Sequence, residues 1–174
     1  MLGRKGSLLA IAAALLATCG AACSQATAGA ASKLVSGHEE FQSVVTSVSS
    51  FDKGGTSSFI ATGVIGGGGL AVTVNDSATW TAIVKLPGGS FRLFESGGSG
   101  THHLDKATCI FTQHTNGTFK VSHGTGKYAG ISGRGTYHYD WLMAAPHGPS
   151  DSCPFDVPPV AIQQITKFSG TVSY

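Results

Sequence analysis

One carboxyl group of the chain stands where it could act in catalysis. Glu95 ends the predicted strand 90–95 (SFRLFE). At the mouth of a β-barrel, burial would raise the pKa of such a side chain and let it exchange protons near neutral pH. The simpler interpretation is a solvated strand end. Glu95 is therefore a weak candidate for a catalytic residue, and the sequence offers no better one.

A second group of residues has the chemistry of metal ligands. His138 and Asp140 are two residues apart and hence share one face of a strand. Beside a third ligand such as His114 they could bind a metal ion. We favour packing or an exposed polar face, so the sequence assigns no metal and no cofactor. Two further pairs are interpreted as solvated: His102–His103 in a polar link, and Glu39–Glu40 before a strand.

Segment 123–137 (HGTGKYAGISGRGTY) invites comparison with phosphate-binding loops, but its spacing is wrong. A Walker A loop needs glycine at position 121 and Ser or Thr at position 128, where the chain has Val121 and Tyr128. A Rossmann turn must open a helix, in which Gly133 and Gly135 would cost about 1 kcal/mol each. We expect β-structure instead, with Gly124 and Gly126 in a turn, Tyr128 as an aromatic plug, and Gly130, Gly133 and Gly135 where strands bend or cross.

The first thirty residues are typical of a secretory signal peptide. Arg4 and Lys5 precede a ten-residue apolar run, and small residues with Ala-x-Ala patterns follow. The run is too short for a membrane-spanning helix, and we expect no span elsewhere. We predict a cleaved helical leader over 1–30, one domain over 31–174, and a secreted protein. The alternative is a lipid anchor at Cys19, because residues 16–19 (LATC) resemble a lipobox.

Removing the leader simplifies the cysteine and charge balance. Only Cys109 and Cys153 remain, and two cysteines in an exported chain are expected to pair as a disulfide. Arg4 and Lys5 are the only basic residues of the leader, so eleven Lys and Arg become nine, equal to the nine acids. The predicted mature chain is neutral. Nucleic acid and anionic membranes are therefore not expected as partners.

The rest of the chain has the pattern of an all-β domain. Alternation, β-branched residues and glycines recur, without a helical period. We predict strands over 41–48, 57–65, 70–74, 79–86, 90–95, 108–114, 118–121, 135–142 and 160–174, with a hairpin turn at Asn116–Gly117, a flexible link over 96–100 and a proline-rich loop over 146–159. Short connections favour a single closed antiparallel barrel, and a two-sheet β-sandwich is the alternative.

The glycine segment also carries a family resemblance. HGTGKYAGISGRG resembles the G-G-T-G-x-aromatic-x-G-A-x-G signature of the allene oxide cyclase and dirigent superfamily, with His123 and Ile131 as departures. Residues 86–119 are similar to small secreted actinobacterial proteins with the same barrel. The resemblance implies an eight-stranded up-and-down barrel and, as in plant members, a homotrimer. The signature is structural, so no catalytic residue carries over.

Two function classes follow from these observations. The first, which we favour, is a secreted non-catalytic barrel that binds an apolar small molecule. The second is an enzyme or stereochemical guide like the resembled family, an isomerase or cyclase acting inside the barrel. The enzyme class predicts an open cavity with at least one buried carboxylate, whereas a barrel filled by side chains would exclude it.

Overall fold

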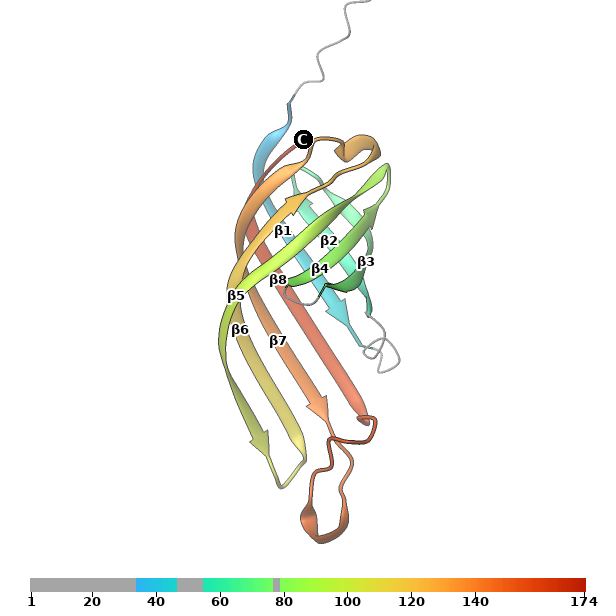
Figure 1. Cartoon of the computed structure of the whole chain (residues 1–174), viewed down its shortest axis with the longest axis vertical. Helices are drawn as coiled ribbons and strands as arrows, with labels where there is room; N and C mark the ends of the chain where they lie inside the picture. Colours follow the sequence, from blue (N-terminus) through green and yellow to red (C-terminus); the bar gives the residue numbers. More distant parts are fainter. Residues whose placement is uncertain (1–33, 47–54, 77–78) are drawn as a thin grey trace, which may run out of the picture. The chain divides into compact units, whose positions relative to one another are not determined.

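The chain folds into a closed eight-stranded antiparallel barrel (Figure 1). The computed structural model describes residues 34–46, 55–76 and 79–174, which belong to one compact unit; the predicted leader and Cys19 lie outside them. The strands are β1 (Ser36–Val45), β2 (Thr56–Gly63), β3 (Gly67–Asp76), β4 (Thr79–Leu86), β5 (Gly89–Asp105), β6 (Ile110–Ser122), β7 (Ser132–Ala144) and β8 (Ala161–Ser173). Each strand pairs with its sequence neighbours, and β1 pairs with β8. The predicted up-and-down barrel is confirmed, and the sandwich alternative is wrong.

Helical structure is minimal in this part of the chain. The described residues contain only two short 3-10 turns, η2 (Gly126–Tyr128) and η3 (Pro149–Asp151). No helix among them has the length and apolar character needed to cross a lipid bilayer.

The two halves of the barrel differ in strand length. β1 to β4 have eight to ten residues, whereas β5 to β8 have thirteen to seventeen. The long strands run past the short ones at the end where β5 and β7 finish, as Figure 1 shows. We call this the open end, and the opposite end, which carries η2, the closed end.

Two predicted breaks between strands and one predicted strand boundary are wrong. Residues 96–100 lie inside β5, and Asn116–Gly117 lies inside β6, where Asn116 pairs with His138. The predicted strands 108–114 and 118–121 are therefore one strand. Glycines 67–69, which fall in the gap between the predicted strands 57–65 and 70–74, belong to β3. A Cβ at Gly69 would lie 2.0 Å from the Lys85 carbonyl oxygen, so only glycine fits at that position.

The closed end is packed with aromatic rings. The ring of Phe41 lies 5.3–6.4 Å from those of Phe59, Phe91, Phe119 and Phe168, all of them buried. Tyr128 enters from η2 and is 1% exposed. Its ring meets Phe91 edge-on, and its hydroxyl donates a hydrogen bond to the Pro87 carbonyl. The predicted aromatic plug is thus confirmed.

Gly126, Gly133 and Gly135 act as expected, whereas Gly130 lies in the turn after η2 and not where strands bend or cross. Gly126 and Gly130 have positive φ, at 57° and 81°. Gly124 does not, but a Cβ there would overlap the Tyr128 carbonyl oxygen at 1.7 Å. Gly133 and Gly135 allow close approach of β8, since added Cβ atoms would lie 2.8 and 2.1 Å from its carbonyl oxygens.

Glu39 is fully buried, which contradicts its interpretation as a solvated residue. It is 0% exposed, and Oε2 accepts a hydrogen bond of 2.7 Å from the Ile65 backbone N–H. Burial raises the pKa of this carboxyl. Its role is to hold the β2–β3 connection, whereas Glu40 beside it is exposed as predicted.

The predicted disulfide is confirmed. Cys109 and Cys153 are bonded, with their Cα atoms 5.3 Å apart. The bond ties the connection between β7 and β8 to the β5–β6 turn. In Figure 1 this connection extends past the ends of β7 and β8, at the open end.

Candidate ligand site inside the barrel

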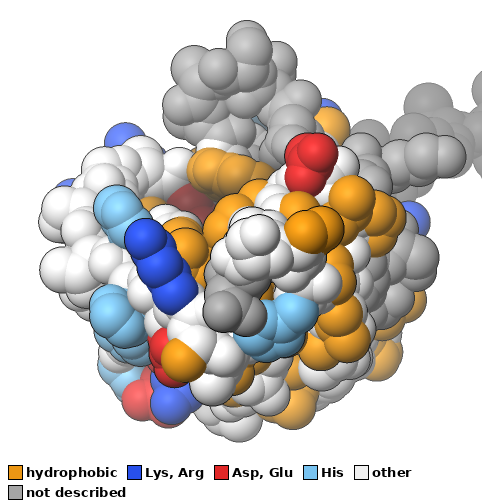
Figure 2. Space-filling model, turned by 90° about the horizontal axis from the view of Figure 1, so that it is seen from below, with side chains coloured by type: hydrophobic (Ala, Val, Ile, Leu, Met, Phe, Trp, Pro, Cys, Tyr) orange, Lys and Arg blue, Asp and Glu red, His pale blue; other side chains and the backbone are white. Residues whose placement is uncertain are grey.

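The open half of the barrel contains a cavity of about 390 Å³. Figure 2 looks at this end of the molecule and shows hydrophobic and polar side chains around a hollow. The volume lies within the usual range for small-molecule sites. The lining consists of aromatic rings, small aliphatic groups, hydroxyls and amides, from Ser43, Val45, Gly55, Ser57, Phe59, Ala71, Thr73, Trp80, Ala82, Leu93, Glu95, Gln113, Thr115, Tyr137, Tyr139, Trp141, Gln164, Thr166 and Phe168.

Among the residues that the structure describes, Glu95 is the only carboxyl group in this lining. It follows Phe91 and Leu93 on the inner face of β5 and directly precedes a register irregularity between Ser96 and Ser99. Such bulges redirect side chains at functional sites. Burial raises the pKa of Glu95 to about 7. The carboxyl is therefore close to half protonated at neutral pH.

Two tyrosines face the same cavity as Glu95. Burial and, secondly, the charge of Glu95 raise the pKa of both Tyr137 and Tyr139, so both hydroxyls stay protonated at physiological pH. Gly117 leaves room for the Tyr137 ring, because an added Cβ would lie 2.5 Å from its Cε1 atom. This close approach explains why glycine stands in the middle of β6.

Both tryptophans of the chain also line the cavity. Trp80 pairs with Glu95 across β4 and β5 and is 61% exposed, so it stands at the rim. Trp141 contacts Phe111 at 5.4 Å, and Phe111 contacts Phe155 of the disulfide-tied connection. A row of rings thus joins that connection to the cavity wall.

Short hydrogen bonds arrange the polar part of the lining. The hydroxyl of Ser43 donates to that of Ser57 at 2.8 Å, and the Gln113 amide donates to the Thr115 hydroxyl at 3.1 Å. The cavity therefore combines rings for stacking with fixed hydroxyls and amides and one titratable carboxyl. This mixture suits an apolar or aromatic molecule that carries polar substituents.

The sequence could have identified more of this lining than it did. Residues 135–142 (GTYHYDWL) alternate strictly, and Tyr137, Tyr139 and Trp141 all face inward. The two-residue alternation of this strand can be recognised in the sequence, but the sequence does not show which of its two faces points into the barrel. The polar lining from Ser43, Ser57 and Gln164 has no sequence signal, because isolated serines and glutamines are typical of exposed strands.

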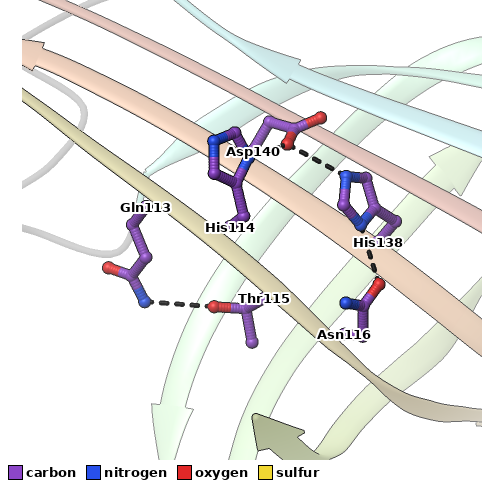
Figure 3. A network of polar contacts seen from close by, with 6 residues as sticks. All are labelled: Gln113, His114, Thr115, Asn116, His138 and Asp140. Atoms are coloured by element: carbon purple, nitrogen blue, oxygen red, sulfur yellow. Dashed lines mark hydrogen bonds and ion pairs between the residues drawn. The ribbon is translucent and has the colours of Figure 1, made fainter. Parts of the chain in front are cut away.

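The histidines and Asp140 lie outside the cavity lining. His114, His138 and Asp140 are close together on the outer face of β6 and β7 (Figure 3). His102 and His103 are exposed as predicted but belong to β5, where His102 stacks on Phe111 at 5.9 Å.

A shallow groove of about 710 Å³ also crosses the outer face of the barrel. Glu40, His138 and Lys167 contribute to its lining, and all three are exposed. The groove is larger than the cavity, but these charged and titratable groups remain solvated. It therefore lacks the buried carboxyl that distinguishes the interior site.

The signature glycines and Tyr128 form the closed end, so they support the barrel and do not line the cavity. Comparison of the chain with family models, with curated proteins and with solved structures gives no match.

Proposed function

We propose that this barrel binds an apolar or aromatic small molecule in its open half, with a polar group of the ligand beside Glu95. The observation that carries the proposal is that one end of the barrel interior is packed with side chains and the other end is hollow. Five phenylalanines and Tyr128 fill the closed end, while about 390 Å³ remains free at the other. Empty space of this size reduces stability, so a barrel needed only as a rigid module would gain from filling it.

The chemistry of the lining indicates the class of ligand. Aromatic rings provide stacking surfaces, while Tyr137, Tyr139 and Glu95 supply a small set of convergent polar groups. With a pKa of about 7, Glu95 donates a hydrogen bond in slightly acidic solution and accepts one in slightly basic solution. Phenols and amphiphiles with one hydroxyl, carbonyl or carboxyl group fit this combination. The proposal includes export of the protein, as the leader predicts.

A ligand screen with a blocked variant tests this function. The purified protein would be incubated with mixtures of lipids and phenolics and examined by native mass spectrometry. We expect one retained ligand per barrel. Ala82→Phe, which points into the cavity, should abolish retention, whereas Ile83→Phe on the outer face of the same strand should not. The proposal would be contradicted if neither the wild type nor Ile83→Phe retained any ligand.

A second candidate function is isomerase or cyclase activity, as in the family that the sequence resembles. The observation that favours it is a cavity carboxyl whose pKa of about 7 matches general acid–base catalysis at neutral pH. Incubation of the protein with an unsaturated fatty-acid epoxide, followed by chiral product analysis, tests it. Glu95→Gln should lose turnover by roughly 100-fold or more while retaining binding. Equal turnover in Glu95→Gln and wild type would exclude Glu95 as the acid or base.

A further inference from the structure

A cluster of metal-ligating side chains lies on the opposite side of the sheet from the cavity. His114 on β6 is paired directly with Asp140 on β7, and His138 is two residues before Asp140. Thr115, which follows His114 on β6, and Tyr139, which lies between His138 and Asp140 on β7, both face the cavity. Because side chains alternate along a strand, His114, His138 and Asp140 share the outer face. They come from two adjacent, fully paired strands, which fix their backbone positions.

Two imidazole rings converge on one carboxylate oxygen. Nδ1 of His114 lies 2.6 Å from Oδ1 of Asp140, and Nε2 of His138 lies 3.0 Å from the same oxygen. The rings are nearly parallel, with 12° between their planes. One donor atom from each residue lies within 4.8 Å of the other two. Figure 3 shows Asp140 beside both histidines.

Asn116 holds the ring of His138 in place. Nδ1 of His138 lies 2.7 Å from Oδ1 of Asn116, within hydrogen-bond distance. The other ring nitrogen, Nε2, is then directed at the Asp140 carboxylate at 3.0 Å. A hydrogen bond to the ring nitrogen that does not bind the metal is the usual way in which proteins orient a ligating histidine.

We propose that His114, His138 and Asp140 bind a divalent transition-metal ion, such as Zn²⁺, on the outer face of β6 and β7. A set of two imidazole nitrogens and one carboxylate oxygen binds Zn²⁺, Ni²⁺ and Cu²⁺ in preference to Mg²⁺ and Ca²⁺, which favour oxygen ligands. In a tetrahedral zinc site with bonds of about 2.0 Å, the ligand atoms lie roughly 3.3 Å apart. Small side-chain rotations reach this spacing. Three protein ligands leave a position for water or an exogenous ligand.

Zinc titration of the metal-free protein tests the site. The protein, prepared without a histidine tag and stripped with a chelator, would be titrated with Zn²⁺ by calorimetry. We expect saturable binding of one ion per chain and no comparable heat with Ca²⁺. His114→Gln, His138→Gln and Asp140→Asn should each remove this binding, and Asn116→Ala should weaken it by roughly 10- to 100-fold. His38→Gln, which alters an exposed histidine outside the cluster, is the matched control and should bind as the wild type does.

Two readouts separate a failed site from a misfolded variant. All four residues are at least partly exposed, so thermal unfolding of the variants in chelator should match that of the wild type. Long-range proton–nitrogen spectra should show the imidazole nitrogen signals of His114 and His138, and not those of His38, shift when Zn²⁺ is added. Absence of one-to-one zinc binding, or equal binding by the cluster variants and His38→Gln, would overturn the proposal. Neither result affects ligand binding in the cavity, which is measured separately.

Discussion

At the scale of single residues, the buried carboxyl of Glu95 makes the stability of the barrel depend on pH. Its pKa is about 7 in the folded protein, whereas the ordinary value for an exposed glutamate is 4.5. Below pH 4.5 the carboxyl is protonated in both states and has no effect on stability. Between pH 4.5 and pH 7 the unfolded state loses its proton first, so the free energy of unfolding falls as the pH rises.

Glu95→Gln should therefore stabilise the protein above pH 7, by up to roughly 3 kcal/mol, and leave it unchanged near pH 4. Urea unfolding at several pH values measures this. Because burial raises the pKa of Glu39 in the same direction, the difference between wild type and variant isolates Glu95. Glu40→Gln, on an exposed carboxyl, should give no such difference. A constant difference across the whole pH range would show that Glu95 titrates normally.

Tyr128 closes the packed end, and its hydrogen bond and its buried ring should each contribute to the free energy of unfolding. Tyr128→Phe removes the hydrogen bond to the Pro87 carbonyl and should cost about 1 kcal/mol. Tyr128→Ala also removes a buried ring and should cost about 3–5 kcal/mol. Denaturant unfolding tests both, with the exposed Val157→Ala as a control expected within about 0.5 kcal/mol. A small loss in Tyr128→Ala would mean that the plug does not stabilise the barrel.

At the scale of elements, sequence prediction succeeded where local signals and long-range packing agreed. The predicted strand 79–86 matches β4, and the predicted final strand 160–174 matches β8 to within one residue at each end. It failed at Asn116–Gly117, where a strong local turn signal lies inside a long strand. Gly117 is required there by the ring of Tyr137, twenty residues later, and that contact leaves no trace in the local sequence.

The contact between Gly117 and Tyr137 predicts the effect of a single methyl group. Gly117→Ala places a Cβ 2.5 Å from the Tyr137 ring, which must then move within the cavity wall. We expect loss of stability by about 1–3 kcal/mol and weaker ligand retention. Gly68→Ala is the control, because its new methyl group meets only the Phe59 carbonyl oxygen at 3.8 Å. Equal behaviour of the two variants in thermal unfolding and native mass spectrometry would contradict this role.

The disulfide acts on the whole molecule, since it joins residues 44 positions apart. Replacing both Cys109 and Cys153 with Ser should lower the free energy of unfolding by roughly 4 kcal/mol in the chain-entropy model. Denaturant unfolding of this variant and of the reduced wild type measures the loss. Unchanged stability in both would show that the β7–β8 connection contributes little.

The interior of the molecule, packed at one end and hollow at the other, leads to the central claim that the cavity binds a small molecule. Both tryptophans line that cavity, so intrinsic fluorescence reports on it directly. Titration with a brominated phenol and a brominated fatty acid should quench the emission of the wild type saturably for at least one of the two. Ala82→Phe should not show this saturable quenching, and Ile83→Phe should. Quenching that is weak, linear and the same in all three proteins would contradict the claim.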